Sequence, residues 1–269
     1  MISMVSKIGC PARFTTNRTT IDDYRRALSA EIGLLLTVHP SNYEIRGFTS
    51  RPAPDELAAF AAEAGLPWIH DQGTGCVVPL DEFGVPGETT VAQCLGWGAT
   101  LVAFSGDKLL AGPQAGILVG AEEAIARAAR HPVARAVRPD KLTLAALGAT
   151  LRDWKRGAWR EFPIYRAAAF PLDALERRGA ALAGAAAPAL AAEVRPSRAV
   201  FGGGTSPEKT FPSRALVLAG GAPDTLAARL RARSRPVVAR LEDDRVWIDL
   251  RSVAPEEDGE VGAALSELR

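Results

Sequence analysis

Apolar runs and segments of helical period alternate through the first half of the chain. The continuous apolar runs are typical of strands that are buried on both faces of a sheet. Strands are expected at residues 32–38, 67–70, 100–105 and 116–120. Helices are expected at residues 54–64, 89–96 and 121–130. This alternation, with short connections, predicts an α/β fold whose parallel or mixed sheet carries helices on both faces.

The second half of the chain has a different pattern. A helix rich in Leu and Ala is expected at 140–156, and the Ala-rich stretch 178–193 is also predicted to be helical because Ala is the best helix former. Strands are expected at 198–201, 215–218, 237–241 and 245–250, with a helix at 225–232. These elements predict an α+β module, so we place a domain boundary near residue 155, between domains of residues 1–155 and 156–269.

Composition narrows the classes of function. The net charge of +1 carries no bulk signature of nucleic-acid binding, so any RNA contact requires a local basic patch. Cys10, Cys76 and Cys94 form no CxxC pair, which argues against a zinc site or a disulfide framework and favours a reducing, cytoplasmic compartment. No apolar run reaches the roughly 18–20 residues that span a bilayer, and the first ten residues lack the apolar region of a signal peptide.

A lysine and two aspartates follow strands of the predicted sheet. Asp71 ends one strand, and Asp107 and Lys108 lie just past the end of another. Ligands of open α/β sheets bind beyond the carboxyl ends of the strands, so these groups point to one edge. A desolvated lysine there can attack an aldehyde, and an aspartate can keep a pyridinium nitrogen protonated. From spacing alone, two unrelated surface loops are an equally good interpretation.

Two polar motifs near this edge are weaker on their own. Residues 112–116 (GPQAG) predict a tight turn that would present Gln114 to a ligand, although a plain turn explains them equally well. His39 follows the strand at 32–38, where a lone histidine is more often packed or hydrogen-bonded than catalytic.

Two further motifs could bind anions. Arg135 and Arg138, within a basic stretch from 127 to 141, could clamp an oxyanion, but a solvated basic helix end is the favoured interpretation of the pattern alone. Three consecutive glycines at 202–204 could cradle a phosphate, yet they match no phosphate-binding fingerprint and favour a flexible loop.

Taken together, these motifs resemble one family, the bacterial selenocysteine synthases or L-seryl-tRNA(Sec) selenium transferases. The run FSGDKLLAGPQAGILVG at 104–120 is the most specific part of the resemblance. The other matching segments, in the family's order, are 15–18 (TTNR), 38–42 (VHPSN), 71–75 (DQGTG), 140–151 (DKLTLAALGATL), 202–204 and 212–213. The resemblance covers roughly residues 14 to 269.

The resemblance implies a fold-type-I, aminotransferase-like pyridoxal phosphate enzyme, with part of the large domain followed by a small α+β domain. In this scheme Lys108 is the Schiff-base lysine, Asp107 acts beside it in catalysis, and Asp71 faces the pyridine nitrogen. The remaining cofactor-binding positions are His39, Asn42, Ser105 and Gln114. Arg135 and Arg138 match arginines that receive the oxyanion of the selenium donor, which reverses the preference for a solvated basic stretch. No metal is implied.

The implied activity converts L-seryl-tRNA(Sec) to selenocysteinyl-tRNA(Sec) with selenophosphate. The seryl amine displaces Lys108, which then takes the α-proton, and loss of water from Cβ gives an aminoacrylyl intermediate to which selenium adds. Two alternatives remain. A lyase or ammonia-lyase of the same superfamily would release ammonia from a free amino compound, and a non-catalytic subunit would show no turnover.

Members of this family are much longer than the present chain and form homo-oligomers. Ahead of the TTNR run they carry a tRNA-binding domain and the first half of the cofactor domain, whereas residues 1–13 do not resemble the family. We therefore expect the C-terminal part of an enzyme, with one edge of its sheet uncovered. We also expect that this chain by itself does not bind pyridoxal phosphate tightly.

Overall fold

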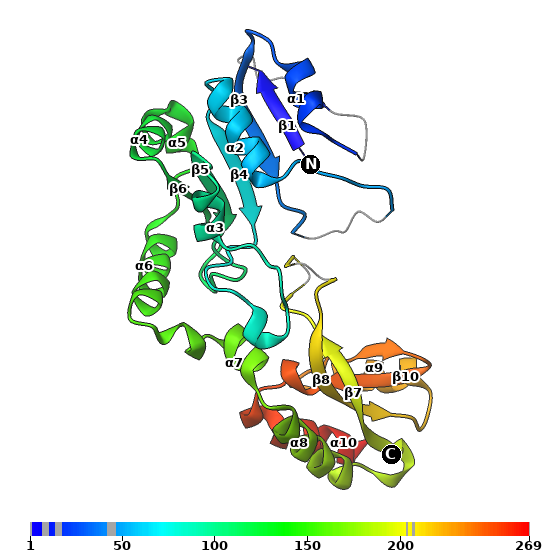
Figure 1. Cartoon of the computed structure of the whole chain (residues 1–269). Helices are drawn as coiled ribbons and strands as arrows, with labels where there is room; N and C mark the ends of the chain where they lie inside the picture. Colours follow the sequence, from blue (N-terminus) through cyan, green and yellow to red (C-terminus); the bar gives the residue numbers. More distant parts are fainter. Residues whose placement is uncertain are drawn as a thin grey trace. The chain divides into compact units, whose positions relative to one another are not determined.

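The computed structural model describes residues 2–6, 11–13, 18–41, 47–202, 204–205 and 208–268, the first two ranges by backbone alone. The chain forms two compact units (Figure 1). The first unit holds Met1–Trp159 and Phe201–Lys209, and the second holds Arg160–Val200 and Thr210–Arg269. Residues 201–209 thus belong to the first unit, although their neighbours in sequence on both sides belong to the second. The domain boundary expected near residue 155 stays a prediction.

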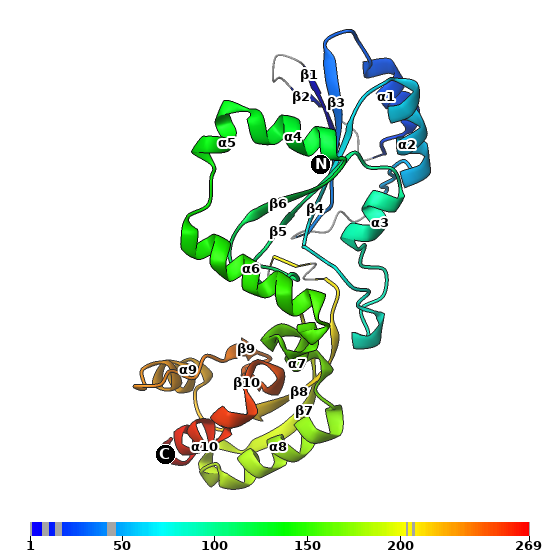
Figure 2. The same ribbon diagram turned by 90° about the vertical axis from the view of Figure 1, so that its left-hand side faces the viewer.

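The first unit is built on a six-stranded mixed sheet, which confirms the predicted α/β class. In spatial order its strands are β2 (Pro11–Arg13), β1 (Ile2–Ser6), β3 (Ile32–Val38), β4 (Trp68–Gly73), β5 (Leu101–Ser105) and β6 (Gly116–Gly120). Strands β3, β4 and β5 run parallel, so their carboxyl ends meet at one edge of the sheet (Figure 2). Strands β1 and β6 add to this parallel centre in the antiparallel sense.

Strand β1 corrects one expectation about the sheet. About four strands were expected in this sheet, all within residues 30–120, but β1 pairs with β3 from Ile2 opposite Thr37 to Ser6 opposite Ile32, and β2 pairs with β1. That expectation was wrong because strand pairing is made by backbone N–H and C=O groups, which any extended segment can supply. The pattern of residues 1–13 in the sequence does not predict strand β1.

Six α-helices accompany this sheet in the described part of the first unit. They are α1 (Ile21–Ala27), α2 (Pro54–Glu63), α3 (Val91–Gly96), α4 (Glu122–Arg130), α5 (Pro132–Ala136) and α6 (Lys141–Lys155), with a 3₁₀ turn η1 (Asp81–Phe83). Helix α6 is capped by Asp140, whose carboxylate accepts hydrogen bonds from the backbone N–H of Leu142 and Thr143 at 2.7 and 3.0 Å. The core between sheet and helices is partly aromatic, with Tyr24, Phe60 and Trp68 almost fully buried.

The second unit is a four-stranded antiparallel sheet with helices packed on it. The strand order is β7 (Ala192–Ala199), β8 (Phe211–Leu218), β10 (Arg245–Asp249) and β9 (Arg240–Glu242). Its helices are α7 (Pro163–Ala169), α8 (Leu172–Ala185), α9 (Pro223–Arg231) and α10 (Asp258–Glu267), with short 3₁₀ turns η3 (Pro188–Leu190), η4 (Leu250–Ser252) and η5 (Pro255–Glu257). A further turn, η2 (Ala158–Glu161), lies where the two units meet in sequence. The core of this unit is an aliphatic cluster.

The Ala-rich stretch 178–193 is only partly the helix that its composition predicts. Helix α8 ends at Ala185, and residues 192–199 form strand β7, so the strand expected at 198–201 begins earlier. The reason is long-range pairing, since β7 matches β8 at eight successive positions from Ala192–Leu218 to Ala199–Phe211. Hydrogen bonds along that ladder outweigh the weak helical preference of alanine.

Candidate active site

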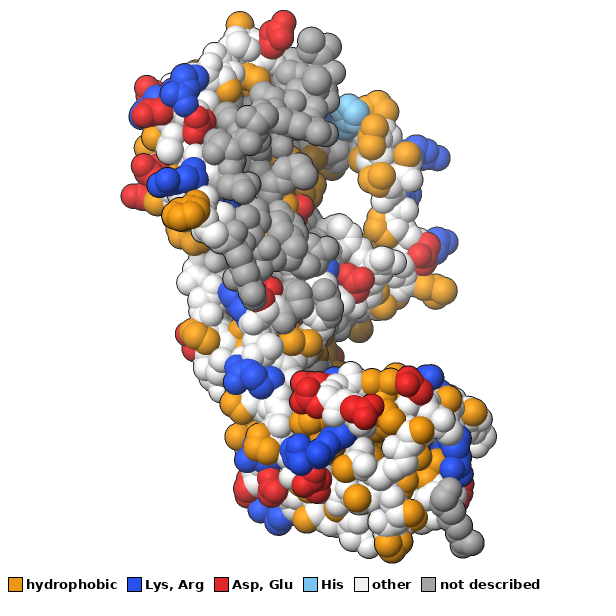
Figure 3. Space-filling view, turned by 90° about the vertical axis from the view of Figure 1, so that its right-hand side faces the viewer, with side chains coloured by type: hydrophobic (Ala, Val, Ile, Leu, Met, Phe, Trp, Pro, Cys, Tyr) orange, Lys and Arg blue, Asp and Glu red, His pale blue; other side chains and the backbone are white. Residues whose placement is uncertain are grey.

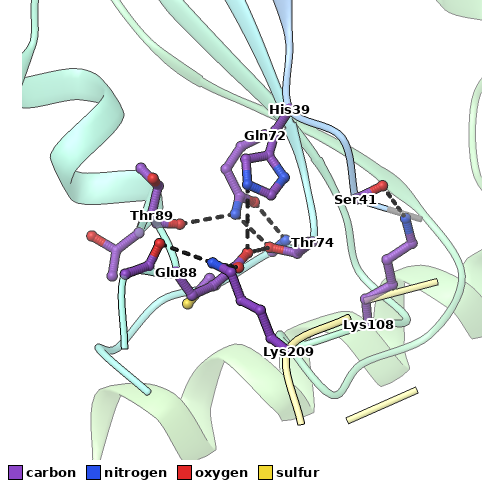
Figure 4. A network of polar contacts seen from close by, with 12 residues as sticks. His39, Ser41, Gln72, Thr74, Glu88, Thr89, Lys108 and Lys209 are labelled. Carbon is purple, nitrogen blue, oxygen red and sulfur yellow. Dashed lines mark hydrogen bonds and ion pairs between the residues drawn. The ribbon is translucent and has the colours of Figure 1, made fainter. Parts of the chain in front are cut away.

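Lys108 lies in a tight turn just beyond the carboxyl end of β5. Backbone hydrogen bonds fix the turn: Gly106 N–H donates to the carbonyl of Ala115 at 2.8 Å, and Leu109 N–H donates to that of Thr74 at 2.9 Å. The half-buried Lys108 side chain reaches back over the sheet edge, where its Nζ donates to Ser41 Oγ at 3.4 Å (Figure 4). The amine is therefore held at the edge where the parallel strands end.

Two glycines allow the backbone segments to approach each other here. A Cβ on Gly106 would stand 2.6 Å from the carbonyl oxygen of Pro113, and one on Gly75 would stand 2.6 Å from that of Ser105. Gly75 also has a φ of +68°, which disfavours side chains. The FSGDK and DQGTG runs thus need glycine for the lysine turn to close.

An open pocket of about 860 Å³ brings five of the predicted site residues together. Its lining includes Ser105, Asp107, Lys108, Gln114 and Arg138. Ser105 ends β5, Gln114 lies in the turn before β6, and Arg138 lies in the segment between α5 and α6. Three chain segments therefore converge on the lysine, and they carry a cation, a carboxylate and neutral polar groups into one polar pocket.

Arg135 and Arg138 do not share a helix face. Helix α5 ends at Ala136, so Arg135 lies on the helix and Arg138 lies beyond it. Arg135 is exposed and is not among the residues that line the pocket around Lys108. The two proline residues of this stretch, Pro132 and Pro139, keep the helix short.

Asp71 lies at the same edge as Lys108, one strand away. It pairs with Val38 across β3 and β4, and its carbonyl accepts a hydrogen bond from His39 N–H at 2.7 Å. The Cβ position of Gly73 is 3.8 Å from Asp71 Oδ1 and 3.1 Å from Ser41 Oγ. Asp71 and the partner of Lys108, Ser41, therefore flank the same glycine. Asn42 lies outside the described residues, as do residues 15–17.

His39 is largely buried, with its side chain 17% exposed. Its Nε2 lies 4.0 Å from Glu88 Oε1, while its Nδ1 is buried without a hydrogen-bond partner. Burial lowers the pKa of His39, and the Glu88 carboxylate opposes that shift. The imidazole is thus held mainly neutral beside the sheet edge, which suits packing or hydrogen bonding to a ligand more than charge pairing.

Sequence reasoning missed a buried polar network behind this edge (Figure 4). Glu88, with a side chain only 1% exposed, accepts hydrogen bonds from Thr74 Oγ1 at 3.0 Å and from Lys209 Nζ at 2.9 Å. Gln72 donates to Thr74 Oγ1 and, at 3.0 Å, to the carbonyl of Thr89. No local signal marks Glu88 or Lys209, since they are 121 residues apart in sequence. Ser41 could have been found, because it follows β3 at the edge already assigned to the site.

The described residues contain no cluster of metal-binding side chains, and no helix among them is both long and apolar enough to cross a membrane. Figure 3 shows acidic and basic side chains interspersed over the face of the second unit that it presents. That face offers no patch of a single sign.

Comparison with known proteins gives concordant results. The family model of L-seryl-tRNA selenium transferase matches residues 4–254. The match begins at residue 4, so the expectation that residues 1–13 do not resemble the family was wrong for residues 4–13. Curated L-seryl-tRNA(Sec) selenium transferases from Hyphomonas neptunium and Serratia proteamaculans are 40% and 41% identical to the chain, over 94% and 90% of its length. The one from Moorella thermoacetica is 41% identical over 93% of it.

The chain spans only 55–56% of the length of these three relatives. Among solved structures, a D-glucosaminate-6-phosphate ammonia-lyase superposes with a TM-score of 0.63 at 19% identity, covering 94% of this chain and 62% of its own. That likeness concerns the fold, which is the aminotransferase-like fold of type I that the resemblance implied.

Proposed function

The chain belongs to the L-seryl-tRNA(Sec) selenium transferase family, and from this we propose that it carries the lysine-bearing part of a pyridoxal phosphate site. The reaction served is the conversion of L-seryl-tRNA(Sec) to selenocysteinyl-tRNA(Sec) with selenophosphate. The observation that carries the proposal is the single pocket in which Lys108 meets Ser105, Asp107, Gln114 and Arg138. A homo-oligomeric assembly and a cytoplasmic location are parts of the same proposal.

The residues present fit pyridoxal phosphate. The pocket volume of about 860 Å³ is within the range of small-molecule sites. Lys108 supplies the primary amine that an aldehyde requires, and its Nζ touches only one side-chain hydroxyl at 3.4 Å among the contacts described. Gly73 packs closely against Ser41, since an added Cβ there would lie 3.1 Å from Ser41 Oγ. The absence of a side chain at Gly73 therefore keeps Ser41 and Asp71 close together at the sheet edge that carries Lys108.

Each residue has a defined task in this proposal. Lys108 would hold the cofactor through its amine, and the same amine would move the proton at the substrate Cα. Asp71 would keep the ring nitrogen protonated, while Ser105 and Gln114 would orient the cofactor by hydrogen bonds. The bound cofactor supplies an electron sink for the charge that develops at Cα. Arg138 would receive the oxyanion of selenophosphate in the pocket, and Arg135, which lies outside the pocket on α5, would add positive charge near it.

The site test uses the chain itself. It is incubated with pyridoxal phosphate, reduced with borohydride and digested, and the phosphopyridoxyl group is located by mass spectrometry. We expect the adduct on Lys108 in clear excess over the exposed Lys155, and we expect Lys108→Ala to abolish it. Equal labelling of both lysines would contradict the assignment of Lys108.

Tightness of binding is measured separately. At equimolar cofactor we expect no stoichiometric absorbance band of the lysine-bound cofactor at about 420 nm. The reason is that, in this proposal, the chain carries only the part of the site that contains Lys108. A stoichiometric band that Lys108→Ala removes would overturn that expectation. Turnover with seryl-tRNA(Sec) and selenophosphate distinguishes the proposed reaction from release of ammonia from a free amino compound.

A further inference from the structure

The described residues between 201 and 209 (201–202, 204–205 and 208–209) are here called the return segment, and they contact the rest of the first unit at three points. The ring of Phe201 meets Phe83 of η1 edge-on, with centroids 5.9 Å apart and an interplanar angle of 80°. Gly204 lies beside Lys108, and Lys209 lies beside Glu88. The return segment therefore runs from the 3₁₀ turn past the lysine to the buried network.

The contact between Lys209 and Glu88 is a partly buried ion pair, in which the carboxylate is buried and the lysine is partly exposed. Lys209 Nζ donates to Glu88 Oε2 at 2.9 Å and to the carbonyl of Gly87 at 2.9 Å. The side chains of Lys209 and Glu88 are 27% and 1% exposed. Such a pair contributes only while both partners are present, because removing one leaves a desolvated charge without compensation.

Glu88 joins the return segment to the lysine turn. Its Oε2 accepts from Lys209, and its Oε1 accepts from Thr74 Oγ1 at 3.0 Å. The carbonyl of the same Thr74 accepts from the N–H of Leu109, the residue after Lys108, at 2.9 Å. One carboxylate thus ties together two segments that both touch Lys108.

Gly204 gives the return segment a direct contact with the lysine. A Cβ at this position would lie 3.4 Å from Lys108 Cε and 3.9 Å from its Nζ, so the glycine backbone stands close to the end of the side chain. The amine is therefore confined between Ser41 Oγ and the return segment. The direction in which Nζ is presented depends on where Gly204 is held.

We infer that Glu88 and Lys209 are positioning residues, which hold the return segment over Lys108 and so set the orientation of its amine. This inference rests on the proposed role of Lys108, but the geometry that carries it lies outside the pocket lined by the predicted site residues. The pair acts through the backbone at Gly204 and Thr74, and it touches no reacting atom.

The test is competitive acetylation of lysine amines in the whole chain, without cofactor, over a series of pH values. The rate at Lys108 is read by mass spectrometry relative to the exposed Lys155, and hydrogen exchange of the return segment is followed in parallel. We expect Lys209→Met to raise the relative rate at Lys108 by about threefold or more and to speed exchange in the return segment. Lys209→Arg retains the ion pair and is expected to restore both values.

Two further variants keep the result interpretable. Glu88→Gln with Lys209→Met removes both charges, so it replaces the single variant if an unpaired Glu88 prevents folding, and the same rise is expected. Arg25→Met removes an exposed ion pair with Asp22 in the same unit and should change nothing. A relative rate at Lys108 equal to that of the native chain, in both the single and the double variant, would overturn the inference. Failure of the proposed cofactor role appears separately, as absence of the borohydride adduct from Lys108 in the native chain.

Discussion

The two units of this protein differ most in what their interiors contain. Of the nine buried polar side chains among the described residues, eight lie in the first unit, and only Ser213 lies in the second. The second unit instead centres on a cluster of fifteen buried aliphatic residues. Buried polar groups cost free energy unless they are hydrogen-bonded, so their concentration in one unit needs a reason.

Three of the eight buried polar side chains of the first unit lie together at the candidate site. Gln72, Thr74 and Glu88 lie immediately behind the sheet edge that carries Lys108, and they hold its turn in place. Among the described residues, His39 Nδ1 and His70 Nε2 of the first unit are buried without a hydrogen-bond partner, as is Arg233 Nε of the second. In the second unit, Ser213 is paired to Asp249 at 2.7 Å. The first unit thus gives up part of its free energy of folding by burying polar groups near the candidate site, whereas the second unit is stabilised mainly by packing of apolar side chains.

The largest effect is expected from the apolar core of the second unit. Leu216→Ala removes a fully buried side chain of β8 and should lower the free energy of unfolding of that unit by about 2–5 kcal/mol, since a cavity remains. Hydrogen exchange measured in increasing urea reports each unit separately. We expect protection to fall in β7, β8 and β10 and to persist in β3, β4 and β5.

The control for this variant is Leu241→Ala, because Leu241 is 46% exposed and little packing is lost. Equal loss of protection in both units after Leu216→Ala would break the comparison, since it would mean that the two units unfold together.

A smaller effect, confined to the first unit, is expected on lowering the pH. His70 is packed edge-on against Trp97 and bonded through Nδ1 to Thr37 Oγ1 at 2.7 Å, and burial lowers its pKa from 6.5 to about 4. As the pH falls, the imidazole therefore takes up a proton in the unfolded chain before it does so in the folded chain. The contribution of neutral His70 to the free energy of unfolding is thus fully present above pH 6.5 and is lost as the pH falls toward 4. The full loss is about 3 kcal/mol.

Urea unfolding at pH 7 and pH 4.5 measures this dependence. His70→Gln should flatten the part of the pH dependence that belongs to the first unit, whereas His131→Gln, at an exposed position, should leave it unchanged. If the pH dependence is unchanged in His70→Gln, then carboxylates rather than this imidazole determine how the free energy of unfolding varies between pH 7 and pH 4.5.

The smallest effect is expected at the single buried polar group described in the second unit. Ser213→Ala removes one donor to Asp249, which still accepts from Ser197 Oγ at 2.8 Å and from Arg251 N–H at 3.1 Å. The free energy of unfolding should fall by about 1 kcal/mol. Thermal unfolding of Ser213→Ala is compared with that of Ser197→Ala, whose position is less buried, so a smaller loss of stability is expected. If Ser213→Ala destabilised the protein more than Leu216→Ala does, the contrast between the two units would be contradicted.

Much of the fold could be read from local patterns. The strands at 32–38 and 116–120 were predicted with the bounds that the structure shows, because a continuous apolar run or a glycine-bounded run is a local property. Helix α6 was predicted to within one residue at each end for the same reason, since Asp140 caps it. Strand β1 was not predicted, and the start of β7 was placed six residues too late, because each strand is defined by pairing with a strand distant in sequence.

The candidate site divides in the same way. The sequence by itself determined that Lys108 follows a strand and that Asp71 lies near the end of another, and parallel strands bring such positions to one edge whatever their side chains are. Only the tertiary structure decided that Arg138 joins the pocket of Lys108 while Arg135 does not. Only it brought Lys209 to Glu88 across 121 residues. The periodicity of a strand is a property of neighbouring residues, so the sequence shows it directly. The partly buried ion pair between Lys209 and Glu88 instead depends on which distant segments pack together, and the spacing of residues along the chain does not predict that.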